Sequence, residues 1–225
     1  MFNFLYKNFS RSFQLFFLRI GIGLKNYKNF SDLNFKQDDF INYKIIKHYV
    51  LKDNFVKNLI AQDVHTFNFL FFYQKLGGKK GIELSKINIF LWFKKFKYHK
   101  NFLWGTDYAS KRFINLIYSY DFVCSISNQR EIAYINKILN FHIKRISFEV
   151  GIKTPDNISY SEILALVLIE CCKNSLSSKV NKKIDKLINY QIDENAMHKS
   201  YNILEHAKFL NNLILFFQLS FYFLE

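Results

Sequence analysis

Proline, glycine and arginine are all scarce in this sequence. Only one proline and seven glycines occur in 225 residues. Sandwiches and barrels need frequent tight turns, which these residues usually form, so their scarcity argues against an all-β fold and predicts long helices. Arginine occurs at five positions, and lysine carries most of the positive charge. Arginine is the better ligand for phosphates and carboxylates, so its scarcity weakens the case for a dedicated polyanion-binding protein.

Cysteine is also rare and has no metal-binding spacing. Cys124 stands alone and Cys171 is followed directly by Cys172, an arrangement that fits neither a zinc site nor a disulfide framework. All three lie among apolar residues, which favours buried, reduced thiols and a cytoplasmic location. The sequence has no GxGxxG, P-loop, GxSxG or HExxH motif, and these are the usual signatures of cofactor and catalytic sites. We therefore expect no cofactor and no metal.

The net charge of +14 permits attraction to nucleic acid, anionic lipid or acidic sugars. Lysine is dense only at residues 79–80, 94–100 and 179–186. The stretch WFKKFKYHK (92–100) interleaves lysine with aromatic residues, a pattern that can stack on single-stranded nucleic acid. It more simply describes a helix that buries its phenylalanines and solvates its lysines. Nucleic acid is therefore not an expected partner.

Neither end of the sequence predicts a membrane span. The apolar run from Phe13 to Leu18 is ended by Arg19 with no small-residue cleavage site after it, which favours an amphipathic helix over a secretory signal. The run LILFFQLSFYFL (213–224) is twelve residues long, whereas a span needs about twenty. Association with a membrane surface stays open as an alternative.

Hydrophobic residues make up 50% of the chain, which is enough for a sizeable core. We expect residues 1–50 to hold one amphipathic helix and an irregular polar segment, and residues 51–225 to form an all-α domain. Within that domain, apolar residues recur at helical spacing and Gly77-Gly78 predicts a helix stop. The expected helices cover residues 64–76, 82–98, 107–122, 131–148, 160–174, 180–192 and 201–225. Antiparallel helix pairs in succession are typical of α/α arrays, solenoids and toroids.

Two of these segments also predict where their helices lie in the fold. In 131–148, Ile135, Leu139, His142 and Ile146 fall on one apolar face. The segment 160–174 is apolar nearly all round, which predicts an inner position.

Three motifs follow one another along the chain in a characteristic order. The first is VHTFNFLFFYQKLGG (64–78), the second WGTDYASKRFINL (104–116) and the third QIDENAMHKSYN (191–202). In order and spacing they resemble segments of the bacterial heparinase II/III-like polysaccharide lyases. The residues that match the family patterns in the second and third motifs are Trp104, Asp107, Arg112, Asn115, Gln191, His198, Ser200 and Asn202.

The resemblance covers residues 64–224 and implies an incomplete α/α toroid. In the family, this helical domain is followed by a β-sandwich that closes over a cleft for anionic polysaccharide. The resemblance therefore implies acidic polysaccharide as a partner. The residues that it implies for substrate binding are Trp104, Asp107, Arg112, Asn115, Ser200 and Asn202.

The chain departs from the family pattern at positions that carry the chemistry. Residues 195–197 replace the glycine-containing part of the third motif, and Tyr201 replaces its arginine. The first residue of the family's Asn-His pair corresponds to Asn157, and the histidine is absent. The family's tyrosine corresponds to Glu205, which is followed by His206.

These departures matter because of what a polysaccharide lyase must do. It neutralises a uronate carboxylate, removes the neighbouring proton and expels the glycosidic oxygen. This requires an amide or imidazole at the carboxylate, and a base and an acid within about 3 Å of the protons they move. Asn157 is the candidate for the first role, and His198 and His206 are the candidates for proton transfer. We expect that this polypeptide alone is not a competent lyase, and its status as an enzyme stays open.

Each candidate also has a plain structural interpretation. His198 satisfies the backbone of its turn, His206 is an ordinary helix residue, and Asn157 is a natural turn residue. Asp107 and Arg112 form an ion pair near a helix start.

The aromatic candidates have structural interpretations too. Trp92 and Trp104 belong to the core more often than to a sugar-stacking surface, and His65 packs or caps. Two alternatives to the lyase resemblance remain. One is a non-catalytic basic helical interaction protein at a membrane surface. The other is a truncated or split gene product whose β-rich partner domain is encoded separately.

Overall fold

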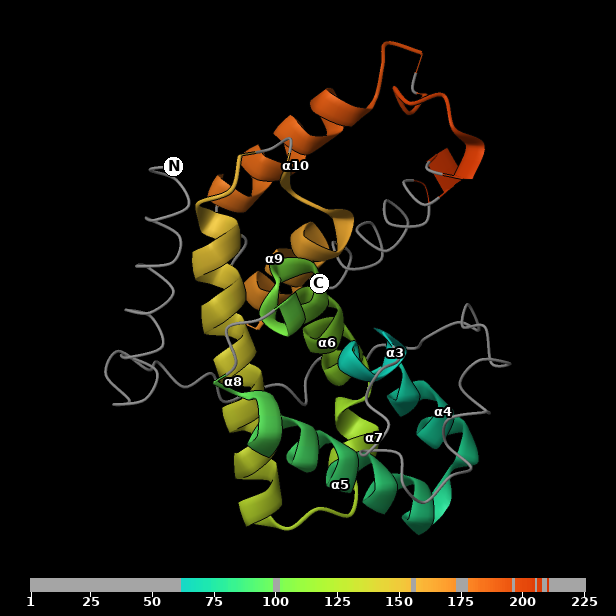
Figure 1. Ribbon diagram of the computed structural model, residues 1–225, viewed down its shortest axis with the longest axis vertical. Coiled ribbons are helices and arrows are strands. Elements are labelled where there is room, and N and C mark those ends of the chain that lie inside the picture. The colour runs from blue at the N-terminus through green and yellow to red at the C-terminus, as the bar shows by residue number, and fades with distance from the viewer. Residues whose placement is uncertain are drawn as a thin grey trace. The chain divides into compact units, whose positions relative to one another are not determined.

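The computed structural model describes residues 62–98, 102–154, 157–172, 178–195, 197–204, 206–207 and 210. These residues form helices without a named strand, and an isolated antiparallel bridge joins Ile192 to His198. The all-α prediction is therefore confirmed for this part of the chain (Figure 1). The expected helix in residues 1–50, the expected domain boundary at 50/51 and the apolar run 213–224 lie outside the described residues.

The helices follow one another along the chain with short connections. In order they are α3 (Gln62–His65), α4 (Phe69–Leu76), α5 (Gly78–Phe96), the 3₁₀ helix η1 (Phe102–Trp104), α6 (Thr106–Tyr118), α7 (Tyr120–Cys124), α8 (Gln129–Gly151), α9 (Tyr160–Cys171) and α10 (Ser178–Gln191). Four expected helices are confirmed with shifted bounds, as α5, α8, α9 and α10. The expectation of one unbroken helix is wrong for 64–76, which is interrupted at 66–68, and for 107–122, which is interrupted at Ser119.

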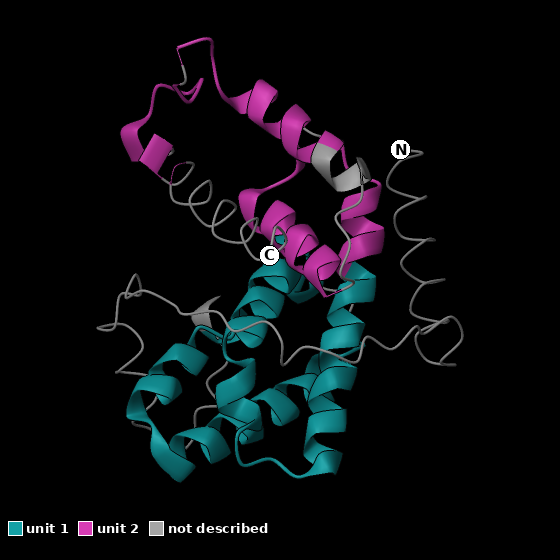
Figure 2. Cartoon of the chain, turned by 180° about the vertical axis from the view of Figure 1, so that it is seen from behind, with its two compact units in different colours: residues 1–145 teal, residues 146–225 magenta. Residues whose placement is uncertain are grey.

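The chain divides into two compact units, residues 1–145 and residues 146–225 (Figure 2). We call them unit 1 and unit 2. The division falls inside α8, so this long helix contributes to both units. It also falls inside the expected 51–225 domain.

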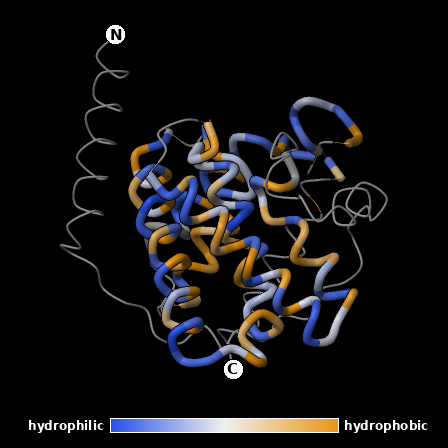
Figure 3. The backbone as a smooth tube through the Cα atoms, turned by 60° about the horizontal axis from the view of Figure 1, so that its bottom comes forward, coloured by the Kyte–Doolittle hydropathy of each residue, from blue (hydrophilic) through white to orange (hydrophobic). Residues whose placement is uncertain are grey.

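The core of unit 1 is built from amphipathic helices. On α5, the side chains of Ile82, Ile89, Trp92, Phe93 and Phe96 are buried on one face, and Figure 3 shows hydrophobic and hydrophilic stretches alternating along the chain. The adjacent lysines of α5, at positions 94 and 95, are exposed. This confirms, for the described start of the 92–100 stretch, that the aromatic residues face the core and that Lys94 and Lys95 face solvent.

Two glycines let α4 and α5 form a tight hairpin. Gly77 and Gly78 have φ angles of 67° and 61°, a left-handed conformation that glycine adopts at little cost. The Gly77 N–H donates to the Tyr73 carbonyl and ends α4, so the expected helix stop is confirmed. One turn further on, a side chain at Gly81 would collide with that same carbonyl oxygen. The hairpin can therefore close this tightly only because Gly81 has no side chain.

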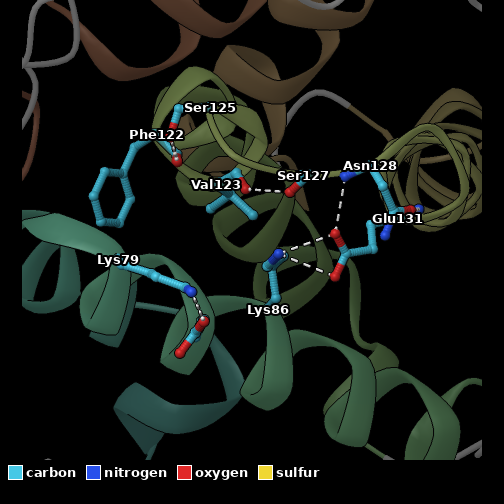
Figure 4. A network of polar contacts seen from close by, with 9 residues as sticks. Lys79, Lys86, Phe122, Val123, Ser125, Ser127, Asn128 and Glu131 are labelled. Atoms are coloured by element: carbon cyan, nitrogen blue, oxygen red, sulfur yellow. Dashed lines mark hydrogen bonds and ion pairs between the residues drawn. The ribbon is translucent and has the colours of Figure 1, made fainter.

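An ion pair connects α5 to the start of α8 (Figure 4). The Lys86 ammonium lies 3.0 Å from each carboxylate oxygen of Glu131. Glu131 and Asn128 also cap α8 reciprocally, since the backbone N–H of each donates to the side chain of the other at 3.0 Å. The hydrogen bond from Lys86, followed by the one from the Asn128 backbone, lowers the pKa of Glu131. This carboxylate therefore serves as both a cap and a tertiary link.

In unit 2, α9 is buried along its length from Glu162 to Cys171, which confirms the expected inner position. Ser159 caps its N-terminus, accepting from the Glu162 N–H while its own N–H donates to the Glu162 carboxylate. Lys153 forms an ion pair with that buried carboxylate at 2.5 Å. α10 packs against α9, and its Lys183 ammonium donates to the Val150 carbonyl near the end of α8. A cation at this position complements the helix dipole.

The three cysteines are all described, and all are free thiols. Cys171 is buried, whereas Cys124 and Cys172 are partly exposed, so the prediction of buried thiols holds fully for Cys171 only. Burial raises the pKa of Cys124 to about 11. Within the described residues, no helix combines the length and the apolar character that a bilayer span requires.

The Lys86–Glu131 pair should contribute measurably to the stability of unit 1. Replacing Lys86 with Met leaves the Glu131 carboxylate without its cation, and we expect a loss of about 1–3 kcal/mol. Urea unfolding followed by tryptophan fluorescence measures this loss, because the chain's two tryptophans, Trp92 and Trp104, both lie in unit 1.

Lys79→Met is the matched control for this substitution. Lys79 lies 3.8 Å from Glu83 on the same helix, and both side chains are largely exposed. Such pairs contribute less than about 0.5 kcal/mol. Equal losses from the two substitutions would contradict the assignment of the Lys86 pair as a tertiary link.

Candidate functional site

The second motif places a fully buried arginine at the centre of unit 1. Arg112 comes from α6 and has 0% exposure. Its guanidinium carbon lies 4.2 Å from the ring centre of Trp92 and 4.7 Å from that of Trp104. Arg145 of α8 contacts the Trp104 ring at 4.6 Å. The set that we call the Arg112 cluster consists of Arg112, Arg145, Trp92, Trp104, His65 and His142.

Hydrogen bonds hold the Arg112 guanidinium on two sides. Its Nη1 donates to the His65 carbonyl at 2.8 Å, and its Nε donates to His142 Nε2 at 3.2 Å. Its Nη2 is buried and has no acceptor among the described residues. Burial, followed by the nearby charge of Arg145, lowers the pKa of Arg112. Stacking on two indole rings partly offsets this cost, because aromatic faces attract desolvated cations.

Both histidines of the cluster are engaged by neighbouring groups. His142 Nδ1 lies 2.9 Å from the Ile138 carbonyl, and since its Nε2 accepts from Arg112, the neutral ring carries its proton on Nδ1. Burial, followed by the charge of Arg112, lowers the pKa of His142 well below its ordinary value. His65 Nδ1 accepts the Trp92 indole N–H at 3.1 Å, which confirms that His65 packs. These contacts make both residues structural.

Hydrogen bonds from the second motif also explain why the first motif is not one continuous helix. The chain turns at Phe67, which has a φ of 65° and is completely buried. The Asn115 amide donates to the Thr66 carbonyl at 2.8 Å and to Asn68 Oδ1 at 2.7 Å. The second motif therefore supplies the hydrogen bonds that the break in the first motif needs.

The predicted pairing of Asp107 with Arg112 is wrong. Asp107 forms an ion pair with Lys111, at 2.7 Å, in the first turn of α6. Residues four apart share a helix face, whereas residues five apart do not. Arg112 therefore points into the core while Asp107 stays at the surface.

The six predicted substrate-binding residues differ in exposure. Trp104, Arg112 and Asn115 are buried, with exposures of 1%, 0% and 9%. Asp107 is partly exposed, and Ser200 and Asn202 are exposed. The three buried side chains make structural contacts in unit 1, and their role in substrate binding stays a prediction.

The third motif forms a compact turn in unit 2, which we call the 191–202 turn after its residues. The Asp193 N–H donates to the Met197 carbonyl and the Lys199 N–H to the Gln191 carbonyl. Asp193 Oδ1 accepts the backbone N–H groups of Asn195 and Met197 at 3.0 and 2.9 Å. The hydrogen bond from Met197, together with the one from the Tyr201 hydroxyl, lowers the pKa of Asp193. This carboxylate organises the described part of the turn.

The 191–202 turn ends α10 and brings His198 close to His206. The His198 N–H donates to His206 Nδ1 at 3.4 Å. His198 Nδ1 accepts the Ser200 N–H at 3.2 Å and lies 2.7 Å from the Ser200 hydroxyl. The prediction that His198 satisfies the backbone of its turn is confirmed.

Tyr201 is the most conspicuous residue of this turn. It has a φ of 51°, which is strained for a bulky side chain, and its side chain is 74% exposed. Its hydroxyl donates to Asp193 Oδ2 at 3.2 Å. Lys199 is also exposed, and its ammonium donates to the Asn189 carbonyl. The turn thus presents an aromatic ring beside polar and cationic groups.

Asn157 belongs to the connection between α8 and α9. It is exposed, and its amide donates to the Thr154 hydroxyl at 2.9 Å. Its predicted role at a substrate carboxylate stays a prediction. Within the described part of the chain, no group of three or more His, Cys, Asp or Glu side chains is arranged to hold a metal ion.

Comparisons with protein-family models, curated proteins and solved structures found no match for this chain. The resemblance to the heparinase II/III-like lyases therefore stays an expectation from the sequence motifs.

Sequence reasoning missed part of the Arg112 cluster. The sequence pattern indicated His142, because it is a polar residue on an otherwise apolar helix face. It had no signal for Arg145, which approaches Trp104 from α8 only in the folded chain. It singled out Arg112 in the second motif, but assigned it a partner on its own helix.

Replacing Arg112 with Lys should destabilise unit 1 strongly. A lysine keeps a charge but cannot reproduce the planar fork that reaches both His65 and His142 while stacking on two rings. We expect a loss of about 2–4 kcal/mol in urea unfolding. Arg130→Lys on the exposed start of α8 is the control and should stay within about 0.5 kcal/mol. A tolerated Arg112→Lys variant would show that the contacts of Arg112 contribute little.

The buried neutral His142 should make unit 1 less stable in acid. Its pKa is lowered in the folded state, so below about pH 6.5 the unfolded chain binds a proton that the folded chain does not. The free energy of unfolding is therefore fully retained above the pKa of the unfolded histidine. It falls by about 2 kcal/mol between about pH 8 and about pH 5.

The substitution His142→Gln tests this, because a glutamine oxygen can still accept from Arg112 without titrating. The stability of the variant, measured by urea unfolding across this pH range, should fall less steeply than that of the wild type. His206→Gln in unit 2 is the control and should follow the wild type. Parallel curves for wild type and His142→Gln would refute the assignment.

Proposed function

We propose that this chain is a non-catalytic, heparinase II/III-like helical domain that binds acidic polysaccharide through the 191–202 turn. One observation carries the proposal: the exposed turn displays Ser200, Tyr201 and Asn202 together, with Lys199 directly before them in the sequence. Exposed aromatic rings stack on sugar rings, hydroxyl and amide groups bind sugar hydroxyls, and lysine attracts carboxylates or sulfates.

The positive charge of the chain supports an acidic ligand. The net charge is +14, and attraction to a polyanion grows with such an imbalance. Strain at Tyr201 supports a role for this residue beyond packing, since a bulky side chain at positive φ persists only where the surroundings enforce it. The Tyr201 N–H donates to the His198 carbonyl at 2.8 Å, which holds its backbone in the turn without involving the hydroxyl.

Several observations support a domain that binds without cleaving. A lyase base must be free to take a proton from the substrate. The sequence lacks the histidine of the family's Asn-His pair beside Asn157, and Glu205 stands at the position of the family's tyrosine. In unit 1, His142 is completely buried with both ring nitrogens in contact.

The toroid-like arrangement and the cytoplasmic location belong to the same proposal. The hairpin of α4 with α5 and the packing of α9 on α10 support an array of helix pairs. The three free thiols are compatible with a reducing compartment. A separately encoded β-rich domain is the proposed source of the catalytic groups.

The test is direct binding to a uronate-containing polysaccharide, measured by calorimetry at low and high salt. Tyr201→Ala removes the exposed ring, and we expect about tenfold weaker binding, equivalent to ~1.4 kcal/mol. Tyr201→Phe keeps the ring and should bind within about twofold of the wild type. None of the samples should generate the ultraviolet absorbance of an unsaturated lyase product.

Phe102→Ala is the matched control, because Phe102 is an exposed aromatic residue of unit 1, at 67% exposure. It should leave affinity unchanged. Wild-type affinity in Tyr201→Ala, or an equal loss in Phe102→Ala, would refute the assignment of the turn. A rise in product absorbance would refute the non-catalytic assignment.

A further inference from the structure

The outer face of α5 exposes aliphatic side chains among lysines. Ile87 and Leu91 are 53% and 42% exposed, and they lie one helical turn apart, so their side chains are neighbours. Lys80 precedes them by two turns on the same face, and Lys94 and Lys95 follow them. All three lysines are exposed.

The opposite face of α5 packs in the core of unit 1, so the helix is fixed in place although its outer face is exposed to solvent. Ile89, Trp92, Phe93 and Phe96 are buried in the core of unit 1. Lys86, which is buried on the same helix, forms an ion pair with Glu131. The helix is therefore anchored by its inner face, and exposure of Ile87 and Leu91 does not result from loose packing.

The charges around Ile87 and Leu91 are mostly positive. Lys79, Lys80, Lys94 and Lys95 are exposed, and the acidic residue on this face is Glu83, which lies 3.8 Å from Lys79. The stretch from Lys80 to Lys95 spans about 22 Å at the helical rise per residue. Two exposed aliphatic side chains with lysines on either side along the helix can make both the apolar and the electrostatic contacts that hold a surface helix on an anionic bilayer.

We infer that α5 is a docking face for an anionic membrane surface, with Ile87 and Leu91 entering the headgroup boundary and the four lysines contacting lipid phosphates and carboxylates. Charge complementarity favours lipid, because the lysines attract the anionic headgroups while the aliphatic side chains leave water. A soluble polysaccharide would use the lysines but would give Ile87 and Leu91 no apolar environment. This face is separate from the 191–202 turn and does not depend on the proposed function.

The two kinds of contact should contribute separately. Each lysine near an anionic surface strengthens binding about fivefold, so three lysines together account for about a hundredfold. Ile87 and Leu91 are each about half exposed, and removing that apolar surface should weaken binding about tenfold. The apolar part should persist at high salt, where screening removes most of the electrostatic part.

The experiment is flotation of the full chain with vesicles of phosphatidylcholine alone or mixed with phosphatidylserine. The double variant Ile87→Ser, Leu91→Ser keeps the charge and should bind the mixed vesicles about tenfold more weakly. Its control, Phe102→Ser with Ile126→Ser, removes two other exposed apolar side chains of unit 1. The control should bind like the wild type.

The lysines are tested with two triple variants of equal net charge. Lys80→Gln with Lys94→Gln and Lys95→Gln should weaken binding about a hundredfold. Its control replaces three exposed lysines outside α5 and should lose less than about fivefold; these are Lys137, Lys182 and Lys186. Tryptophan fluorescence during thermal unfolding should show that all variants keep unit 1 folded.

The outcomes divide cleanly. The expected losses, with vesicle binding unchanged in Tyr201→Ala, support the docking face even if polysaccharide binding fails. Absence of wild-type binding to mixed vesicles overturns it. Wild-type binding by the Ile87→Ser, Leu91→Ser variant also overturns it, because α5 would then bind anionic vesicles through its lysines alone. Equal losses in both lysine variants overturn the docking face, because the net charge of the chain would then explain vesicle binding. Binding to soluble polyglutamate but not to vesicles also overturns it, because an acidic protein would then be the partner.

Discussion

The interior of unit 1 depends on one buried guanidinium. Arg112 stacks on Trp92 and Trp104, and it donates to the His65 carbonyl and to His142. A buried charge is costly unless its surroundings replace the lost water. Here two indole faces, a carbonyl and a neutral imidazole provide that replacement. The neutral state of His142 follows from the position of this side chain, and Arg112 together with Asn115 holds the chain at the break in the first motif.

This arrangement changes how the lyase-like motifs are interpreted. The matching residues of the second motif are mostly internal, and they hold the first motif in place. The polar residues of the third motif are at the surface, where Asp193 shapes a turn that exposes Tyr201. A sequence motif can therefore mark buried structural contacts in one unit and a solvent-exposed turn in the other. The proposed polysaccharide binding concerns only the third motif, at the surface of unit 2.

The agreement between sequence and structure is uneven for physical reasons. α8 was predicted because its apolar residues follow the helical period, and burial of that face dominates helix stability in proteins. α9 was predicted from a segment that is apolar nearly all round, which is typical of an inner helix. The break at residues 66–68 was not predicted, because the carbonyls of His65 and Thr66 bond to Arg112 and Asn115, forty-seven and forty-nine residues away. The Asp107–Arg112 pairing was wrong because it relied on closeness in sequence rather than on the helix face.

By itself, the sequence determined the helical class, the stop at Gly77-Gly78, the inner position of α9 and the aromatic character of the core. These depend on backbone preference and on local periodicity, which a single segment contains in full. Only the tertiary structure decided that Arg112 is buried, that His142 is neutral, and that Tyr201, Ile87 and Leu91 are exposed. Burial and charge state depend on groups brought together from distant segments, and no local pattern contains that information.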